Sequence, residues 1–175
     1  GTYAAVCALR MLDMAGIDFE NTEVCAMITD GEEAGLRGCK QWAKDHYDEY
    51  VNSGVETAVL CVDTLADLEY LRVYNKDMTG TVKNSQQFSQ LVMDSAKDSG
   101  HKDLQFSSVY FGSSDAAAFS QAGITATCLA AMDPKPADYY HNRRDTAERL
   151  VPEAIKTGFD VIISTILNFD EKGLN

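Results

Sequence analysis

The stretch ITDGEEAGLRGC, residues 28–39, joins an apolar run to a polar region through a turn rich in glycine. Its centre carries two adjacent carboxylates, Glu32 and Glu33. Like charges this close together oppose each other's ionisation, so a nearby cation would relieve the repulsion. A helix N-terminus, an arginine or a metal ion could supply that charge. Acidic residues placed at the start of a helix are the simpler structural explanation.

Short apolar runs alternate with helical patterns on both sides of this stretch. Such runs are typical of strands that are covered on both faces. We predict strands within residues 22–29, 55–62, 68–75, 104–111 and 124–132, and helices within residues 3–15, 36–50, 84–99, from about 115, and 152–169. The alternation predicts one α/β domain over residues 1–175, with three α/β/α layers around a mainly parallel, mixed central sheet.

Polar side chains follow three of the predicted strands. Glu32 and Glu33 come after the first strand, Asp63 directly follows the second, and His141 lies in the long loop after the strand at residues 124–132. In sheets of this kind a ligand binds in the crevice beyond the carboxyl ends of the strands. We therefore expect these four side chains to converge on one crevice.

Composition and charge narrow the classes of function. The 175 residues carry a net charge of −12 and show no basic patch, which argues against nucleic acid as a partner. No apolar run approaches the roughly 18 residues that a membrane span needs. The acidity is compatible with a metal or a cationic ligand, although solubility alone is the simpler explanation.

The cysteines carry a weak indication of the compartment. They are odd in number and form no C-x-x-C pair, so we interpret them as reduced core residues: Cys7, Cys25, Cys39, Cys61 and Cys128. Reduced thiols favour the cytoplasm. Secretion stays open, because the sequence begins inside a predicted helix and a targeting segment could precede it.

The types of polar residue at the predicted crevice suit a hydrolytic zinc site. Carboxylates and imidazole are zinc ligands, and bound zinc lowers the pKa of its water from 15.7 to about 7 while it polarises a carbonyl. Consecutive side chains in extended backbone point in opposite directions, so one glutamate can bind metal while its neighbour holds the water. Each residue also has a structural alternative: Asp63 could cap a turn, and His141 could be an ordinary surface residue.

Four motifs in order carry a resemblance to a known family: DGEEAGLRGC (30–39), VDT (62–64), GSSDAAAFSQAGITA (112–126) and YYHNRRDT (139–146). Together they resemble the co-catalytic di-zinc aminopeptidases of clan MH, a group that contains bacterial leucyl aminopeptidase. Relatives of that group include glutamate carboxypeptidase, glutaminyl cyclase and the protease-like domain of transferrin receptor. The resemblance covers nearly the whole chain and implies a zinc exopeptidase fold. It also implies an aminopeptidase that acts on peptides with a free N-terminus.

The resemblance implies a role for each matching residue. Glu32 corresponds to the general base, Glu33 and His141 to the ligands of one zinc, and Asp63 to a ligand of the other zinc. Asp67 is the fallback for Asp63.

Asp115 and Asp145 match the motifs without a role in the chemistry itself, and Tyr110 lies next to a further family position. Asp115 corresponds to a positioning residue at a helix start. Asp145 corresponds either to a residue that orients a metal ligand or to a helix cap. Tyr110 lies beside Phe111, where some members have a tyrosine that assists the oxyanion.

The sequence also departs from the family pattern. Members use two zinc ions per complete site, held in addition by a histidine and a bridging aspartate that would both precede residue 1. Where members have Asp-His, this chain has Asp115 and Ala116. We therefore expect this chain alone to bind little or no zinc and to be inactive. A glutaminyl cyclase-like enzyme and a non-catalytic, protease-like binding domain are the alternatives, and the sequence does not indicate an oligomeric state.

Overall fold

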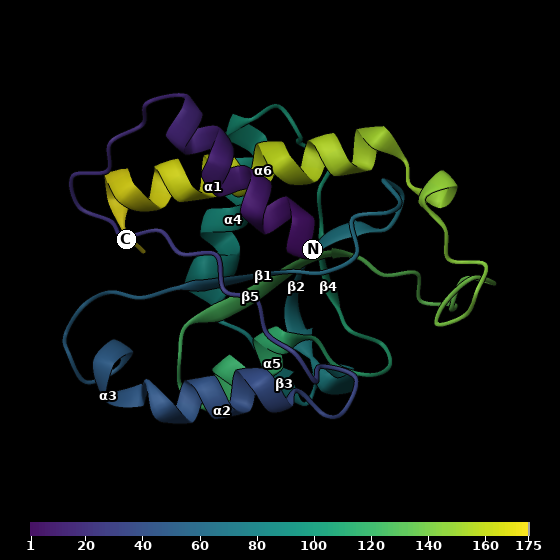
Figure 1. Ribbon diagram of the computed structural model, residues 1–175, viewed down its shortest axis with the longest axis horizontal. Coiled ribbons are helices and arrows are strands. Elements are labelled where there is room, and N and C mark those ends of the chain that lie inside the picture. The colour runs from purple at the N-terminus through teal and green to yellow at the C-terminus, as the bar shows by residue number, and fades with distance from the viewer. Residues whose placement is uncertain (175) are drawn as a thin grey trace.

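A mixed sheet forms the middle layer of the computed structural model, which describes residues 1–174 (Figure 1). Its strands are β1 (Val59–Val62), β2 (Leu71–Asp77), β3 (Val82–Lys83), β4 (Phe106–Ser108) and β5 (Ala126–Ala131), in the order β1-β5-β2-β3 with β4 also paired to β2. β1 runs parallel to β5, and β4 runs parallel to β2. The pairs β2–β5 and β2–β3 are antiparallel. The strand β1 therefore forms one edge of the sheet.

Helices cover both faces of the sheet (Figure 1). On one face lie α1 (Thr2–Met14), α4 (Gln86–Asp98) and α6 (Pro152–Lys172), and on the other α2 (Arg37–Asp45), α3 (Tyr47–Tyr50) and α5 (Asp115–Gln121). Two short 3-10 helices, at Met78–Gly80 and Ala147–Arg149, lie in the connections. Among the described residues, no helix is both long and apolar enough to cross a membrane.

Local sequence explains where the long helices begin. The Ser85 hydroxyl accepts a hydrogen bond of 3.2 Å from the Phe88 amide and so caps α4. Pro152 occupies the first turn of α6, where its missing N–H costs nothing. The apolar face of α4 packs against β2 and β5, and that of α6 packs against α4 and α1.

The sheet separates two apolar cores. Leu71, Val73 and Leu129 lie in the core beneath α1, α4 and α6, whereas Tyr74 and Phe119 lie in the core beneath α2 and α5. All six residues of β5 are buried, which is why the run ATCLAA shows no polar alternation. This arrangement fixes the carboxyl ends of β1 and β5 side by side.

The predicted three-layer fold is confirmed, and its sheet has equal numbers of parallel and antiparallel pairs. The predicted strand at residues 22–29 is wrong, because that segment is extended but belongs to no strand of the sheet. The predicted helix at residues 36–50 is interrupted at His46. The strands predicted at 55–62 and 104–111 are shorter than predicted. The short β3 was not predicted, because two residues leave no readable alternation.

All five cysteines are free thiols, as predicted. Cys39 and Cys128 are buried and Cys7 and Cys61 are half-buried, whereas Cys25 is exposed and is not a core residue. Cys25 lies in the segment that was predicted to be a buried strand, so both errors have one origin.

Candidate active site

The turn at residues 30–38 carries the glutamate pair, and its glycines determine its shape. Gly31 and Gly35 have φ angles of 66° and 97°, a region that glycine adopts without strain. A Cβ on Gly38 would overlap the backbone of Asp30. The Leu36 amide donates to the Glu32 carbonyl over 2.8 Å, which closes the turn just before α2. Glu32 and Glu33 are thereby held at the mouth of a groove.

Glu33 meets His141 across the groove mouth. The Nε2 atom of His141 lies 2.9 Å from a carboxylate oxygen of Glu33, and the two side chains are 51% and 73% exposed. His141 has a left-handed φ of 56°. Its ring stacks on Tyr140, with ring centres 3.8 Å apart, and Tyr140 in turn meets the edge of Phe111. The aromatic pair therefore orients the imidazole toward Glu33.

The surroundings of Glu32 raise its pKa. Partial burial, and then the negative charges of Glu33, Asp63 and Asp115, raise the pKa of Glu32 to about 7, while His141 opposes the shift. A carboxyl group with a pKa near neutrality can both accept and release a proton at physiological pH. Burial is the largest cause of the shift, and the crowding of carboxylates, which a bound cation would relieve, adds to it.

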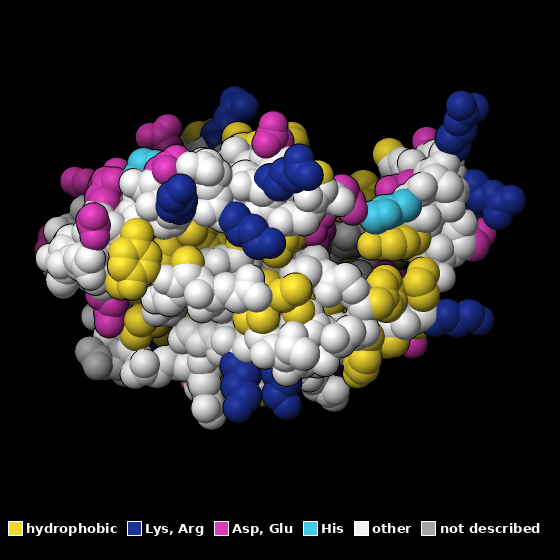
Figure 2. All heavy atoms as spheres, turned by 90° about the horizontal axis from the view of Figure 1, so that it is seen from below, with side chains coloured by type: hydrophobic (Ala, Val, Ile, Leu, Met, Phe, Trp, Pro, Cys, Tyr) yellow, Lys and Arg dark blue, Asp and Glu magenta, His cyan; other side chains and the backbone are white. Residues whose placement is uncertain are grey.

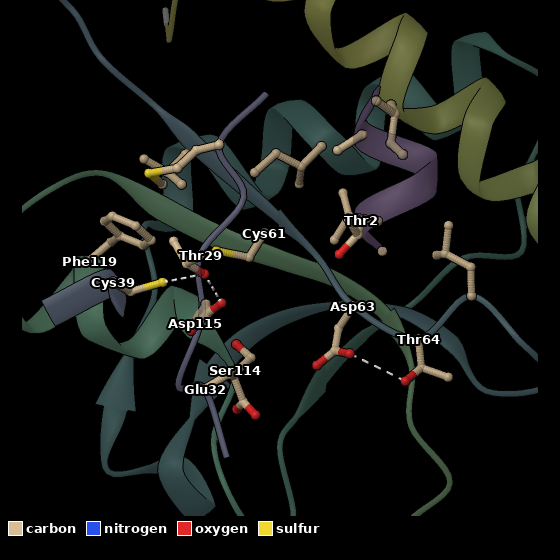
Figure 3. Close-up of a pocket in the computed structure, with 18 of the residues that line it drawn as sticks. Thr2, Thr29, Glu32, Cys39, Cys61, Asp63, Thr64, Ser114, Asp115 and Phe119 are labelled. Carbon is tan, nitrogen blue, oxygen red and sulfur yellow. Dashed lines mark hydrogen bonds between the residues drawn. The ribbon is translucent and has the colours of Figure 1, made fainter. Parts of the chain in front are cut away.

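Asp63 lies at the carboxyl end of β1 and faces the same open space as Glu32 (Figure 3). Its amide donates to the Leu129 carbonyl over 3.2 Å, so the strand pairing extends up to it. The Thr64 hydroxyl donates to its carboxylate over 3.3 Å. Gly1 lies against this strand end, because a Cβ on Gly1 would overlap the Val62 carbonyl and approach Asp63.

Asp115 lies deeper in the groove at the start of α5 (Figure 3). Its Oδ2 atom accepts a hydrogen bond of 3.1 Å from Thr29, whose hydroxyl accepts one of 3.3 Å from the Cys39 thiol. Its Oδ1 atom is buried without a hydrogen-bond partner. Burial and the neighbouring Asp115 raise the pKa of the Cys39 thiol to about 12, so Cys39 stays protonated as a donor.

Sequence reasoning missed Asp77, the fully buried last residue of β2. Its carboxylate accepts hydrogen bonds from the Met78 amide (2.7 Å), the Ser114 amide (3.0 Å) and the Ser114 hydroxyl (2.5 Å). It therefore anchors the loop that places Asp115. Unlike Asp63, which follows an apolar run, Asp77 follows the polar residues Asn75 and Lys76, so the sequence gives no comparable signal for it.

The remaining predicted residues, Asp67, Asp145 and Tyr110, also line the groove. Asp67 caps a turn by accepting the Glu69 amide over 2.9 Å. Asp145 is exposed in a turn, and Tyr110 is 58% exposed. Within residues 1–174, no hydrogen bond or ion pair joins these three to Glu32, Glu33, Asp63 or His141.

The groove that holds these groups has a volume of about 1580 Å³ and is lined by both acidic and apolar side chains. The space-filling view shows apolar side chains gathered around a histidine at one end of the molecule, with acidic side chains nearby (Figure 2). Over the described part of the chain, no three His, Cys, Asp or Glu residues are grouped so that they could hold a metal ion. The structure thus brings together one carboxylate–imidazole pair, with Asp63 apart from it.

The chain is similar in sequence to one known protein family. The sequence model described as "Peptidase family M28" matches residues 1–166. No curated protein matches the chain.

Several solved structures share the fold. LapB from Legionella pneumophila is 16% identical over 98% of this chain and 45% of its own, with a TM-score of 0.78. BSAP, a zinc aminopeptidase from Bacillus subtilis, is 21% identical over 79% of this chain and 34% of its own, with a TM-score of 0.60. A glutaminyl cyclase from an Acidobacteriales bacterium is 17% identical over 79% of this chain and 47% of its own, with a TM-score of 0.62. The chain spans less than half the length of each.

Proposed function

The chain belongs to peptidase family M28, and we propose that it forms the carboxyl-terminal part of the catalytic domain of a zinc aminopeptidase. In the complete enzyme, Glu32 acts as the general base, Glu33 and His141 hold one zinc ion, and Asp63 holds the other. The substrate is a peptide with a free N-terminus, from which one residue is hydrolysed at a time.

The observation that carries the proposal is the pairing of Glu33 with His141 beside a glutamate of raised pKa. An oxygen and a nitrogen donor from segments more than a hundred residues apart meet at 2.9 Å. Glu32, the next residue along the chain, has its pKa raised to about 7 by burial and by neighbouring carboxylates. A ligand pair next to a proton acceptor is the arrangement that metal-assisted hydrolysis requires.

The side chains of Glu33, Asp63 and His141 carry the atom types that bind zinc. Carboxylate oxygen and imidazole nitrogen are both zinc ligands, and the unpartnered Oδ1 atom of Asp115 adds to the negative charge of the groove. Bound zinc would lower the pKa of water and polarise the scissile carbonyl. Asp115, fixed by Thr29 and anchored through Ser114 to Asp77, would position the groove wall rather than take part in the reaction.

The proton transfers fall to Glu32. In the metal-free chain the pKa of Glu32 is raised to about 7, so its carboxyl group can hold or release a proton near neutral pH. The ionised form accepts a proton from the attacking water, and the protonated form then delivers it to the leaving amine. Tyr140 keeps the His141 ring in place through its stacking contact.

The resemblance to the di-zinc family implies two further ligands, a histidine and a bridging aspartate, from residues that would precede Gly1. The chain alone, with only part of each metal site, would then lack activity and bind zinc weakly.

The test is Glu32→Gln in the full-length protein, which we expect to remove turnover of an aminoacyl-4-nitroanilide while zinc content stays unchanged. Glu49→Gln is the matched control, because Glu49 is an exposed glutamate that contacts His46. Full turnover by Glu32→Gln would refute the assignment of Glu32 as base. Loss of zinc from this variant would instead make Glu32 a ligand.

A glutaminyl cyclase-like activity is the second candidate, and the solved glutaminyl cyclase of the same fold favours it. The same carboxyl group would then assist ring closure at an N-terminal glutamine. Ammonia release from a glutaminyl peptide, without release of a free amino acid from other peptides, would identify this activity. Absence of both activities would favour a non-catalytic binding domain. The presence of the paired carboxylates and His141 argues against such a domain.

A further inference from the structure

The turn that carries the glutamate pair, residues 30–38, is closed at its base by its own backbone. The Gly38 amide donates to the Asp30 carbonyl over 3.0 Å. The two sides of the turn approach each other so closely here that a Cβ on Gly38 would overlap the Asp30 backbone. The side chains just outside this bond, Thr29 and Cys39, therefore lie next to each other.

The side chains of Thr29 and Cys39 form a chain of hydrogen bonds that ends on Asp115 (Figure 3). The Cys39 thiol donates to the Thr29 hydroxyl over 3.3 Å, and that hydroxyl donates to the Oδ2 atom of Asp115 over 3.1 Å. Asp115 is the first residue of α5, which packs against β5 and β1 of the sheet. The hydrogen bonds thus tie both ends of the glutamate turn to an element outside it.

The direction of these hydrogen bonds follows from the chemistry of the three groups. A carboxylate only accepts, so the single hydroxyl proton of Thr29 goes to Asp115 and the thiol of Cys39 must supply the other proton. Burial and the neighbouring Asp115 raise the pKa of the Cys39 thiol to about 12, which keeps it protonated. The side chain at position 29 must therefore accept one bond and donate the other, which serine could do and valine could not.

The position of Glu32 depends on how firmly this turn is held. Between residues 30 and 38, Leu36 is the one fully buried side chain, so packing alone fixes the turn at a single point. Glu32 and Asp115 both line the groove, and the charge of Asp115 acts on the Glu32 carboxyl group. A displacement of about 1 Å in a reacting group can lower a rate by about 100-fold, so a loose turn would be costly for a base.

We propose that Thr29 is a positioning residue for the reaction: its hydroxyl links Cys39 to Asp115, clamps the glutamate turn on α5 and so holds Glu32 in place. The inference rests on the proposed function, because it concerns the placement of the general base. Thr29 acts through the turn and takes no part in the proton transfers. A merely structural role, in which the hydroxyl only satisfies the Asp115 carboxylate, would affect stability and leave the rate of the folded enzyme unchanged.

The first test compares Thr29→Val and Thr29→Ser in the full-length protein. We expect Thr29→Val to lower kcat for an aminoacyl-4-nitroanilide by about 10- to 100-fold, with KM and zinc content nearly unchanged, and Thr29→Ser to retain most of kcat. Cys39→Ala removes one of the two bonds and should lower kcat less than Thr29→Val. Thr57→Val is the matched control, because Thr57 also lines the groove but its hydroxyl donates to the Val55 carbonyl of its own segment.

The second test measures the clamp without activity, through hydrogen exchange of single amides followed by NMR in the full-length protein. The amides of Leu36 and Gly38 bond to carbonyls of the glutamate turn. In Thr29→Val we expect both to exchange about 10-fold faster or more, because the turn opens more often, and in Thr29→Ser we expect no change. The Val59 amide, which bonds to the Thr125 carbonyl beside β5, is the internal control.

An unchanged kcat in Thr29→Val, even with a lower melting temperature, would overturn the proposal and leave Thr29 a structural role. An equal loss of kcat in Thr29→Ser would also overturn it, because serine keeps the hydroxyl. Loss of zinc together with kcat would overturn it in favour of a role in metal binding. If the full-length protein hydrolyses no peptide, the proposed function fails, and the exchange test still decides the clamp: faster exchange of the Leu36 and Gly38 amides in Thr29→Val supports it, and equal exchange refutes it.

Discussion

Replacement of Asp77 should destabilise the protein more than replacement of any exposed aspartate. Asp77 is fully buried, and its carboxylate accepts hydrogen bonds from the Met78 amide and from the amide and hydroxyl of Ser114. Hydrogen bonds to charged groups contribute about 1.5–3 kcal/mol each, although such contributions are not additive. Asp77→Ala also leaves two backbone donors without a partner, so we expect a loss of about 3–5 kcal/mol.

Two further variants separate the contacts. Asp77→Asn keeps an oxygen for both amides and can donate to the Ser114 hydroxyl, so we expect a smaller loss of about 1–2 kcal/mol. Ser114→Ala removes one bond and leaves a buried carboxylate oxygen unpaired, which should cost about 1–3 kcal/mol. The double variant Asp77→Ala/Ser114→Ala should lose less than the sum of the single variants, because the two residues share a hydrogen bond.

Urea unfolding at pH 7, followed by circular dichroism and extrapolated linearly, measures these free energies. Asp103→Ala is the control, because Asp103 is exposed and its replacement should change stability by less than about 0.5 kcal/mol. A change of the same small size for Asp77→Ala would refute the reasoning that this carboxylate anchors the loop before α5.

Two other predictions concern the glutamate turn. The pKa of Glu32 is raised from 4.5 to about 7 in the folded chain, so the folded state binds more protons between these values. The metal-free chain should therefore lose stability as the pH rises from about 4.5 to about 7, and Glu32→Gln should reduce that loss. Urea unfolding at several pH values measures both free energies of unfolding. An equal pH dependence in the two proteins would contradict the assignment of this loss to Glu32. Gly38→Ala should lower the melting temperature more than Gly54→Ala, since a Cβ at Gly38 overlaps the Asp30 backbone, whereas at Gly54 it meets no atom and the only cost is the strain of a φ of 77°. The reverse order would contradict the packing.

Much of the fold follows from local patterns in the sequence. The helix α6 shows its buried stripe and its initial Pro152, and the buried strand β5 reads as an uninterrupted run of small and apolar residues. Both features depend on neighbours along the chain. The error at residues 22–29 has the opposite cause, since strand formation needs a partner from elsewhere and the pattern alone cannot show whether one is present.

The site was predictable to the extent that its residues occur in motifs. The motif spacing singled out Glu33 and His141, which lie 2.9 Å apart in the structure. It did not single out Asp77, whose importance depends on burial, or Tyr140, whose role depends on stacking against His141. Burial depends on tertiary contacts, and the stacking of two neighbouring rings depends on the local backbone conformation, here the left-handed φ of His141; no single-sequence pattern encodes either.

The measurement that most directly tests the account is the zinc content of the full-length protein with and without His141. The central claim is that Glu33 and His141 hold one zinc ion together. After dialysis at micromolar free zinc, we expect the content to fall from two ions per protein to one in His141→Ala and to stay at two in His46→Ala, since His46 lies in a separate contact with Glu49. An unchanged zinc content in His141→Ala would contradict the claim.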